Sequence, residues 1–138
     1  MEKEQLKRIF DFLEGKENKK HKDRDNFIWR LKFNEPLTKE DLVVNSDLNL
    51  FGSNLTSLPK GLKVRGYLDL SFSEIKSLPE GLEVSGELNL TDTELTSLPK
   101  GLKVGGNLDT TYTPLAKYTY DELIEMIKPG FIKGEIYN

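Results

Sequence analysis

The chain has 138 residues, which suits one domain with at most a small additional segment. Its formal net charge of −3 is too small to indicate a nucleic-acid mimic or a nucleic-acid binder by itself. The lack of cysteine excludes a disulfide framework, and no segment is apolar for long enough to cross a membrane. We therefore expect a soluble protein of a reducing, cytoplasmic compartment.

Residues 1–41 are expected to form an N-terminal cap. Leu6, Ile9, Phe10 and Leu13 recur at helical spacing between charged residues, so residues 2–14 are predicted to form an amphipathic helix. Such a helix could be presented to a partner or could cover an apolar end of the domain. We favour the covering role.

A polar loop is predicted at residues 16–25, where both signs of charge are interleaved. Its basic side chains, together with Trp29 farther on, make nucleic-acid binding by residues 16–24 the alternative functional hypothesis. His21 is the chain's single histidine and has no neighbouring metal-binding side chain. No metal site is therefore expected there.

A strand is predicted at residues 27–33, whose sequence FIWRLKF alternates apolar and basic side chains. Trp29 lies on the apolar side of this pattern. It either packs inward or serves as an interface anchor, a role that tryptophan often fills.

Residues 42–115 repeat with a period of twenty. The segments 48–67 and 88–107 are identical at 14 of 20 positions, and the segment 68–87 follows the same pattern. A fixed period of this length is typical of a solenoid, in which each repeat is one coil stacked on its neighbours. Apolar residues spaced by two indicate short strands, so stacked coils should form parallel ladders about 4.8 Å apart. We expect about four coils.

Glycine and proline mark the corners of each predicted coil. Gly66, Gly86 and Gly106 lie between the paired apolar positions, where a side chain does not fit or the chain bends. The Leu-Pro-x-Gly-Leu segments at 78–82 and 98–102 supply one fixed and one permissive dihedral each.

The segment LNLTDTELTSLP, residues 88–99, resembles the leucine-rich-repeat pattern LxLxxNxLxxLP. The short period and the Leu-Pro corner are similar to the repeats of small bacterial and bacteriophage leucine-rich-repeat proteins. The sequence departs from that pattern because Ser53, Ser73, Thr93 and Thr113 occupy the usual asparagine position. A hydroxyl can still bond neighbouring backbone or another hydroxyl. The resemblance implies an α+β repeat protein, a short leucine-rich-repeat-like or β-solenoid fold with a cap at each end.

Two columns of charge alternate in sign from coil to coil. They are Lys60, Glu80, Lys100 and Lys63, Glu83, Lys103. Opposite charges one strand spacing apart attract, so both columns are predicted to pair and to fix the stacking register.

The candidate binding residues are polar positions that point outward from the Leu-x-Leu strand, together with aromatic residues that follow it. The first column is Asn49, Asp69, Asn89 and Asp109, and beside it run Asp47, Tyr67, Glu87 and Asn107; the aromatic residues are Phe51, Phe72 and Tyr112. In leucine-rich repeats that strand face is the binding surface. Exposed aromatic residues are common energetic anchors at protein interfaces.

Residues 116–138 are expected to form a C-terminal cap. Thr119 and Glu122 form a capping box for a short helix that ends before Pro129, and residues 131–138 are predicted to be a strand or an extended tail.

We expect a non-enzymatic protein-binding module with no cofactor and no metal, because the sequence offers no paired carboxylates at working distance and no phosphate-binding loop. The resemblance implies an inhibitor or adaptor. One elaboration is a phage-encoded protein that acts in the host cytoplasm on a host defence complex such as a CRISPR effector. A monomer or a small homo-oligomer is expected.

Overall fold

The computed structural model describes residues 31, 37 and 39–138. The chain divides into two compact units, Met1–Asp41 and Leu42–Asn138. The predicted helix at 2–14 and the polar loop at 16–25 lie outside the described residues. Of the predicted strand at 27–33 only Leu31 is described, and it is helical rather than extended. So short an apolar run cannot distinguish a strand from a helix by its periodicity.

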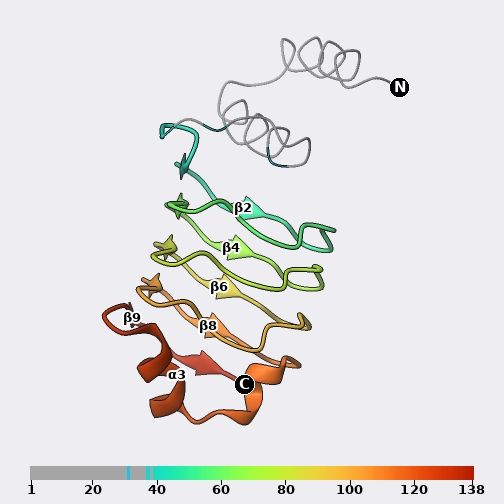
Figure 1. Ribbon diagram of the computed structural model, residues 1–138, viewed down its shortest axis with the longest axis vertical. Helices are drawn as coiled ribbons and strands as arrows, with labels where there is room; N and C mark the ends of the chain where they lie inside the picture. The colour runs from blue at the N-terminus through green and yellow to red at the C-terminus, as the bar shows by residue number, and fades with distance from the viewer. Residues whose placement is uncertain (1–30, 32–36, 38) are drawn as a thin grey trace. The chain divides into compact units, whose positions relative to one another are not determined.

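The second unit is a parallel β-solenoid built from two ladders of very short strands (Figure 1). Sheet A has the order β1-β3-β5-β7-β9, and sheet B has the order β10-β8-β6-β4-β2. The sheet A strands are β1 (Val43–Val44), β3 (Lys63–Val64), β5 (Glu83–Val84), β7 (Lys103–Val104) and β9 (Phe131–Ile132). The sheet B strands are β2 (Leu48–Asn49), β4 (Leu68–Asp69), β6 (Leu88–Asn89), β8 (Leu108–Asp109) and β10 (Ile136–Tyr137).

The twenty-residue period of the sequence is the register of both ladders. Leu48 pairs with Leu68 and Leu68 with Leu88 in sheet B, and the sheet A strands pair at the same offset from β1 to β7. The solenoid therefore has about three turns of the repeating length. The last step is longer, because Lys103 pairs with Phe131, 28 positions along the chain.

The interior is filled by stacked leucine, isoleucine and valine side chains, one from each equivalent position of successive coils. The largest fully buried side chains are Leu48, Leu62, Leu68, Leu70, Ile75, Leu82, Leu88, Leu90, Leu95, Leu102, Leu108 and Leu115. These are the positions that the sequence pattern predicts to face inward. Burial of a leucine contributes roughly 1.5–3 kcal/mol, so this column is the main source of stability.

The hydroxyl residues at the usual asparagine position bond the backbone of their own coil. Ser53 Oγ accepts from the Leu55 amide at 3.1 Å, and Thr93 Oγ1 donates to the Leu90 carbonyl at 2.8 Å. Thr113 Oγ1 donates to the Thr110 carbonyl at 2.6 Å. The predicted bonding to neighbouring backbone is confirmed, and no hydroxyl of this column bonds another among the described residues.

The corner between sheet A and sheet B is a column of glycines. The amide of Gly86 donates to the carbonyl of Gly66, and Gly106 and Gly134 continue the series, at 2.9–3.0 Å. A Cβ on Gly106 would lie 2.9 Å from the carbonyl carbon of Gly86, closer than a side chain tolerates. The prediction that a side chain does not fit is confirmed at Gly66 and Gly106, and at Gly86 a Cβ would make tight contacts of 3.0 Å.

The exit segment ends the stack with a helix and a further pair of strands. The 3-10 helix η1 (Pro114–Lys117) leads to α3 (Tyr120–Ile127), whose predicted capping box between Thr119 and Glu122 is present. Leu123 and Ile127 of α3 are fully buried. Residues 131–138 are not a separate tail, because β9 joins β7 and β10 joins β8 in the register of the repeat.

Candidate functional site

The sheet B face is the surface formed by the side chains that point outward from sheet B and from the residue before each strand. Its members in the order of the coils are Asp47, Asn49, Tyr67, Asp69, Glu87, Asn89, Asn107, Asp109, Glu135 and Tyr137. Five of these ten residues are acidic and none is basic. The face therefore carries a negative potential that no cation on the same face offsets.

The column from Asn49 to Asp109 has a structural role in every coil. In each case the side-chain Oδ1 accepts a hydrogen bond from the amide two residues ahead, at 2.9–3.0 Å. This is the Asx turn that asparagine and aspartate form equally well. The turn explains why both residue types occur in the column. It occupies Oδ1 and leaves the second polar atom of each side chain directed away from this bond.

The neighbouring column links successive coils at two points. Asp47 Oδ1 accepts from the Tyr67 amide at 2.9 Å, and Asn107 Oδ1 accepts from the Glu135 amide at the same distance. Tyr67 is 39% exposed. Together with Asp69, Glu87 and Asn89 it lines an open hollow on the sheet B face.

The aromatic residues lie in the turn that directly follows sheet B. Phe51 and Phe72 are both more than half exposed, and their ring centroids are 5.4 Å apart with the planes tilted by 53°. The two belong to different repeat positions, yet the structure brings them into contact. Tyr112, from the same repeat position as Phe72, is 80% exposed.

Phe72 and Tyr112 have backbone φ angles of 58° and 57°, in the left-handed region that bulky side chains rarely adopt. Gly52 and Asp92 occupy the same turn position in the other coils, with φ angles of 65° and 54°. The fold thus requires this conformation in every coil. An aromatic residue here costs about 1 kcal/mol or more relative to glycine, and its ring is not buried in return.

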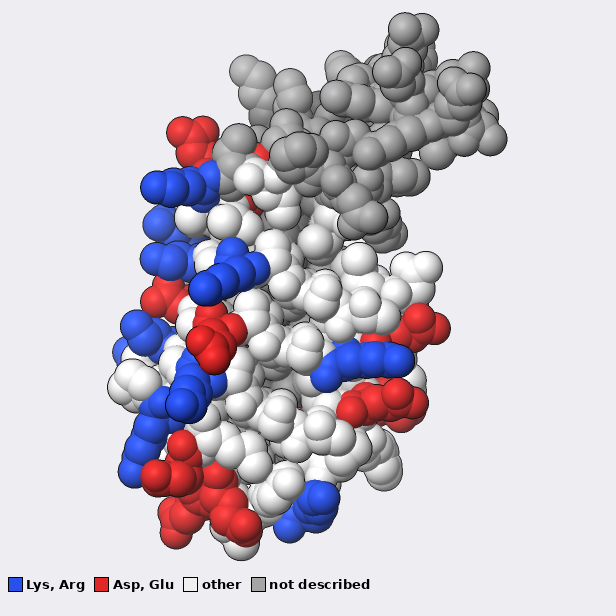
Figure 2. Space-filling model, in the orientation of Figure 1, with Lys and Arg blue, Asp and Glu red and all other residues white. Residues whose placement is uncertain are grey.

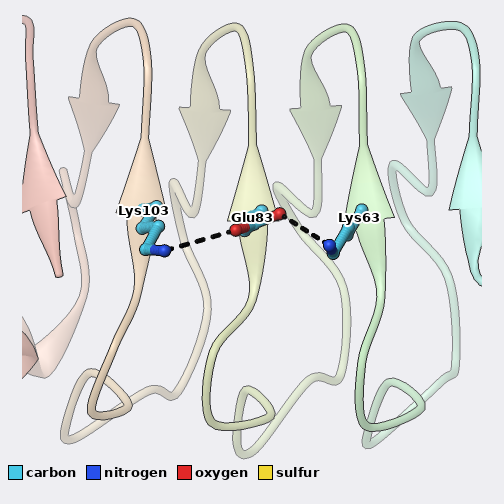
Figure 3. Close-up of polar contacts among 3 residues, drawn as sticks. All are labelled: Lys63, Glu83 and Lys103. Carbon is cyan, nitrogen blue, oxygen red and sulfur yellow. Dashed lines mark hydrogen bonds and ion pairs between the residues drawn. The ribbon is translucent and has the colours of Figure 1, made fainter.

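The other ladder presents a different surface, the sheet A face. Its outward residues are Val43, Asn45, Lys63, Arg65, Glu83, Ser85, Lys103, Gly105, Phe131 and Lys133. Four are basic and one is acidic. In Figure 3, which looks onto sheet A, the strands of sheet B lie behind those of sheet A and run in roughly the opposite direction. In Figure 1 the sheet A strands lie at the left-hand end of the sheet B strands, so the two faces adjoin at the glycine corner and look in different directions.

One of the two predicted charge columns forms ion pairs. Glu83 bridges the coils before and after it, with its carboxylate oxygens 3.5 Å from Lys63 Nζ and 3.4 Å from Lys103 Nζ (Figure 3). The column of Lys60, Glu80 and Lys100 makes no ion pair among the described residues, which contradicts the prediction for it. These three side chains are exposed at the corner after the proline, where the chain is in a turn rather than paired in a ladder.

Figure 2 shows basic and acidic side chains alternating along one edge of the stacked coils, with a broad uncharged area beside them. Such alternation gives little net field on that edge. Charge of a single sign is found instead on the sheet B face.

Sequence reasoning missed two members of the sheet B face, Glu135 and Tyr137, because residues 131–138 lie outside the twenty-residue spacing. The signal was present, since Ile132-Lys-Gly-Glu-Ile136 has the same pattern as Val104-Gly-Gly-Asn-Leu108. The basic residues of the loop at 16–24 and Trp29 lie outside the described residues. The nucleic-acid hypothesis that they support stays a prediction.

Two further observations concern residues 31, 37 and 39–138. They contain no group of three or more histidine, cysteine, aspartate or glutamate side chains placed to hold a metal ion. None of their helices combines the length and the apolar character needed to span a membrane.

No family model matches the chain, and no curated protein and no solved structure matches it. Its function is therefore inferred from its own geometry.

Proposed function

We propose that the chain is a non-enzymatic protein-binding module and that the sheet B face, together with Phe51, Phe72 and Tyr112, is its binding surface. A small solenoid that acts in this way would serve as an inhibitor or an adaptor. The leucine-rich-repeat resemblance belongs to the same proposal, because in that class the corresponding strand face binds proteins.

The observation that carries the proposal is the segregation of charge beside exposed aromatic rings. A solvated surface with no function usually mixes both signs, as the edge in Figure 2 does. The sheet B face instead has five carboxylates and no basic residue. Complementary potential of this kind steers association and selects partners.

The aromatic residues add the apolar contribution that charge alone does not give. Phe72 and Tyr112 are held in a strained conformation while their rings remain in solvent. Strain of this kind is concentrated at functional sites. Aromatic side chains are also the residue class most enriched among interface hot spots.

The test compares capture of host proteins by the wild-type chain and by Asp69→Asn/Asp109→Asn. Asparagine keeps the Oδ1 acceptor of the turn, as Asn49 and Asn89 already do, so this variant removes charge without removing the turn. We expect the captured partner to be lost from the variant. A second bait, Phe72→Gly, should also lose it without loss of thermal stability.

Lys63→Gln/Lys103→Gln, on the sheet A face, is the matched control and should retain the partner. Equal recovery of one partner by all four baits would show that the sheet B face is not the binding surface.

A further inference from the structure

The sheet A face and the sheet B face of one molecule are complementary to each other, coil by coil. Both ladders have five strands with the same register, so their outward side chains recur at the same spacing of about 4.8 Å. The chain passes round every coil in the same sense. Turning a second copy about the solenoid axis until its sheet B face meets the sheet A face of the first therefore makes the facing strands antiparallel. Position 63 then lies opposite position 69, and position 65 opposite position 67.

In the first outward column, opposite charges meet in two of the coils. Lys63 of one copy faces Asp69 of the next, and two coils farther on Lys103 faces Asp109. Each of these aspartates uses Oδ1 in its own turn and has Oδ2 outside that bond. Each lysine shares Glu83 with the other, so neither is fully neutralised within its own chain.

The one acidic residue of the sheet A face does not meet an acidic residue. Glu83 lies in the coil between the two lysines, and the residue opposite it is Asn89, whose side chain also carries donors. In the last coil Phe131 faces Tyr137, both of them exposed. The alternation of asparagine and aspartate in sheet B therefore follows the alternation of sign in sheet A.

The second outward column agrees with the first. Arg65 faces Tyr67, a pair suited to a cation–π contact, and Lys133 faces Glu135. In the coils that contain these residues, no two like charges face each other across the contact. We propose that the sheet B face binds the sheet A face of a second copy of this chain, so that molecules associate laterally with their coils in register.

This inference rests on the proposed function, because it names a partner for the same face. The contact is heterologous, so each added copy leaves one free face of each kind and the assembly can grow beyond a dimer until it closes into a ring. The paired area is small, on the order of 200 Å² per face from the strand spacing and rise, against roughly 800 Å² per partner in stable complexes. Association should therefore be weak and sensitive to salt.

The experiment is sedimentation equilibrium of the full chain across protein concentrations at low and at high salt. The weight-average mass at low salt should at least double by about 1 mM, a concentration at which such weak contacts populate. It should return to the monomer value in about 1 M salt, where the screening length is only about 3 Å. A monomeric mass at every concentration in low salt would overturn the proposal.

The matched variants exploit the internal ion pairs. The triple substitution Lys63→Glu/Glu83→Lys/Lys103→Glu reverses the whole column, keeps both coil-to-coil pairs with reversed sign, and brings like charges against Asp69 and Asp109. It should remain monomeric, and so should Asp69→Lys/Asp109→Lys. An equimolar mixture of the two variants should associate again, because each now carries the sign that the other lacks. If the triple variant alone self-associates as strongly as the wild-type chain, the proposal is contradicted.

If Asp69→Lys/Asp109→Lys fails to fold, Asp69→Asn/Asp109→Asn replaces it. This variant should associate less than the wild-type chain, and the mixing experiment is then left out. The triple variant leaves the sheet B face intact. Should it still capture a foreign partner while wild-type protein does not self-associate, the proposed function would stand and this inference would fail.

Discussion

The outward side chains of the two ladders have different structural roles. On the sheet A face, Glu83 crosses between coils to Lys63 and Lys103. On the sheet B face, the Asn49 to Asp109 column bonds within its own coil and shapes the turn that ends each strand. A pairing between coils must alternate in sign, whereas a turn within a coil needs only an oxygen acceptor. The sheet B face is therefore free to accumulate negative charge, and the sheet A column is not.

The largest loss of stability is expected from a substitution at the corner that joins the two sheets. Gly106→Ala places a Cβ 2.9 Å from the backbone of Gly86, so either ladder must shift. We expect a loss of about 2–3 kcal/mol in the free energy of unfolding, as for overpacked sites, measured by urea denaturation.

The control for that substitution is Gly81→Ala. Gly81 has a φ of 73° and open space where a Cβ would lie, so only backbone strain of roughly 1–2 kcal/mol is expected. A smaller effect at Gly106 than at Gly81 would mean that the glycine column is not tightly packed.

Two substitutions of Asp69 distinguish its role as acceptor in the turn from its role as a negative charge, with an intermediate effect on stability. Asp69→Ala removes the acceptor of the Ser71 amide and should lower the unfolding free energy by about 1 kcal/mol. Asp69→Asn keeps the acceptor and should change it by less than about 0.5 kcal/mol. Thermal melts of the two variants would decide this, since equal losses would attribute the effect to charge rather than to the turn.

A small effect that depends on salt is expected on the sheet A face. Glu83→Gln removes two exposed ion pairs, whose contribution is about 0.2–1 kcal/mol each at low salt. The difference from wild type should shrink in about 1 M salt, where exposed charges are screened. Asp69→Asn should show no such salt dependence of stability, and a salt-dependent loss there would remove the distinction between the two faces.

Most of the fold could be predicted from the sequence, because a buried column imposes the same residue type on every coil. The leucine positions, the corner glycines and the capping box at Thr119 all express local or strictly periodic constraints. The strands β9 and β10 were predicted only as a strand or tail. These strands come after helix α3, so their spacing from the preceding strands is 28 residues and the twenty-residue period does not reveal them.

The candidate site was less predictable for a physical reason. The Phe51–Phe72 contact joins two different repeat positions, and alignment of the repeats cannot show a diagonal neighbour. The left-handed conformation at Phe72 and Tyr112 is equally hidden, because residue preference argues against it. The Asn/Asp column was predicted to face outward, but its turn became evident only from the hydrogen bonds.

The long last step of the solenoid has a consequence for chain entropy. Six pairings at a spacing of twenty residues, three in each sheet, are followed in both sheets by a step of 28 residues that closes onto the same ladders. Lengthening a closed loop from 20 to 28 residues costs only about 0.3 kcal/mol of closure entropy. The coil length is thus set by what each connection must bury and not by the ladders. Extra chain inserted between η1 and α3 should be accommodated without changing the register of either sheet.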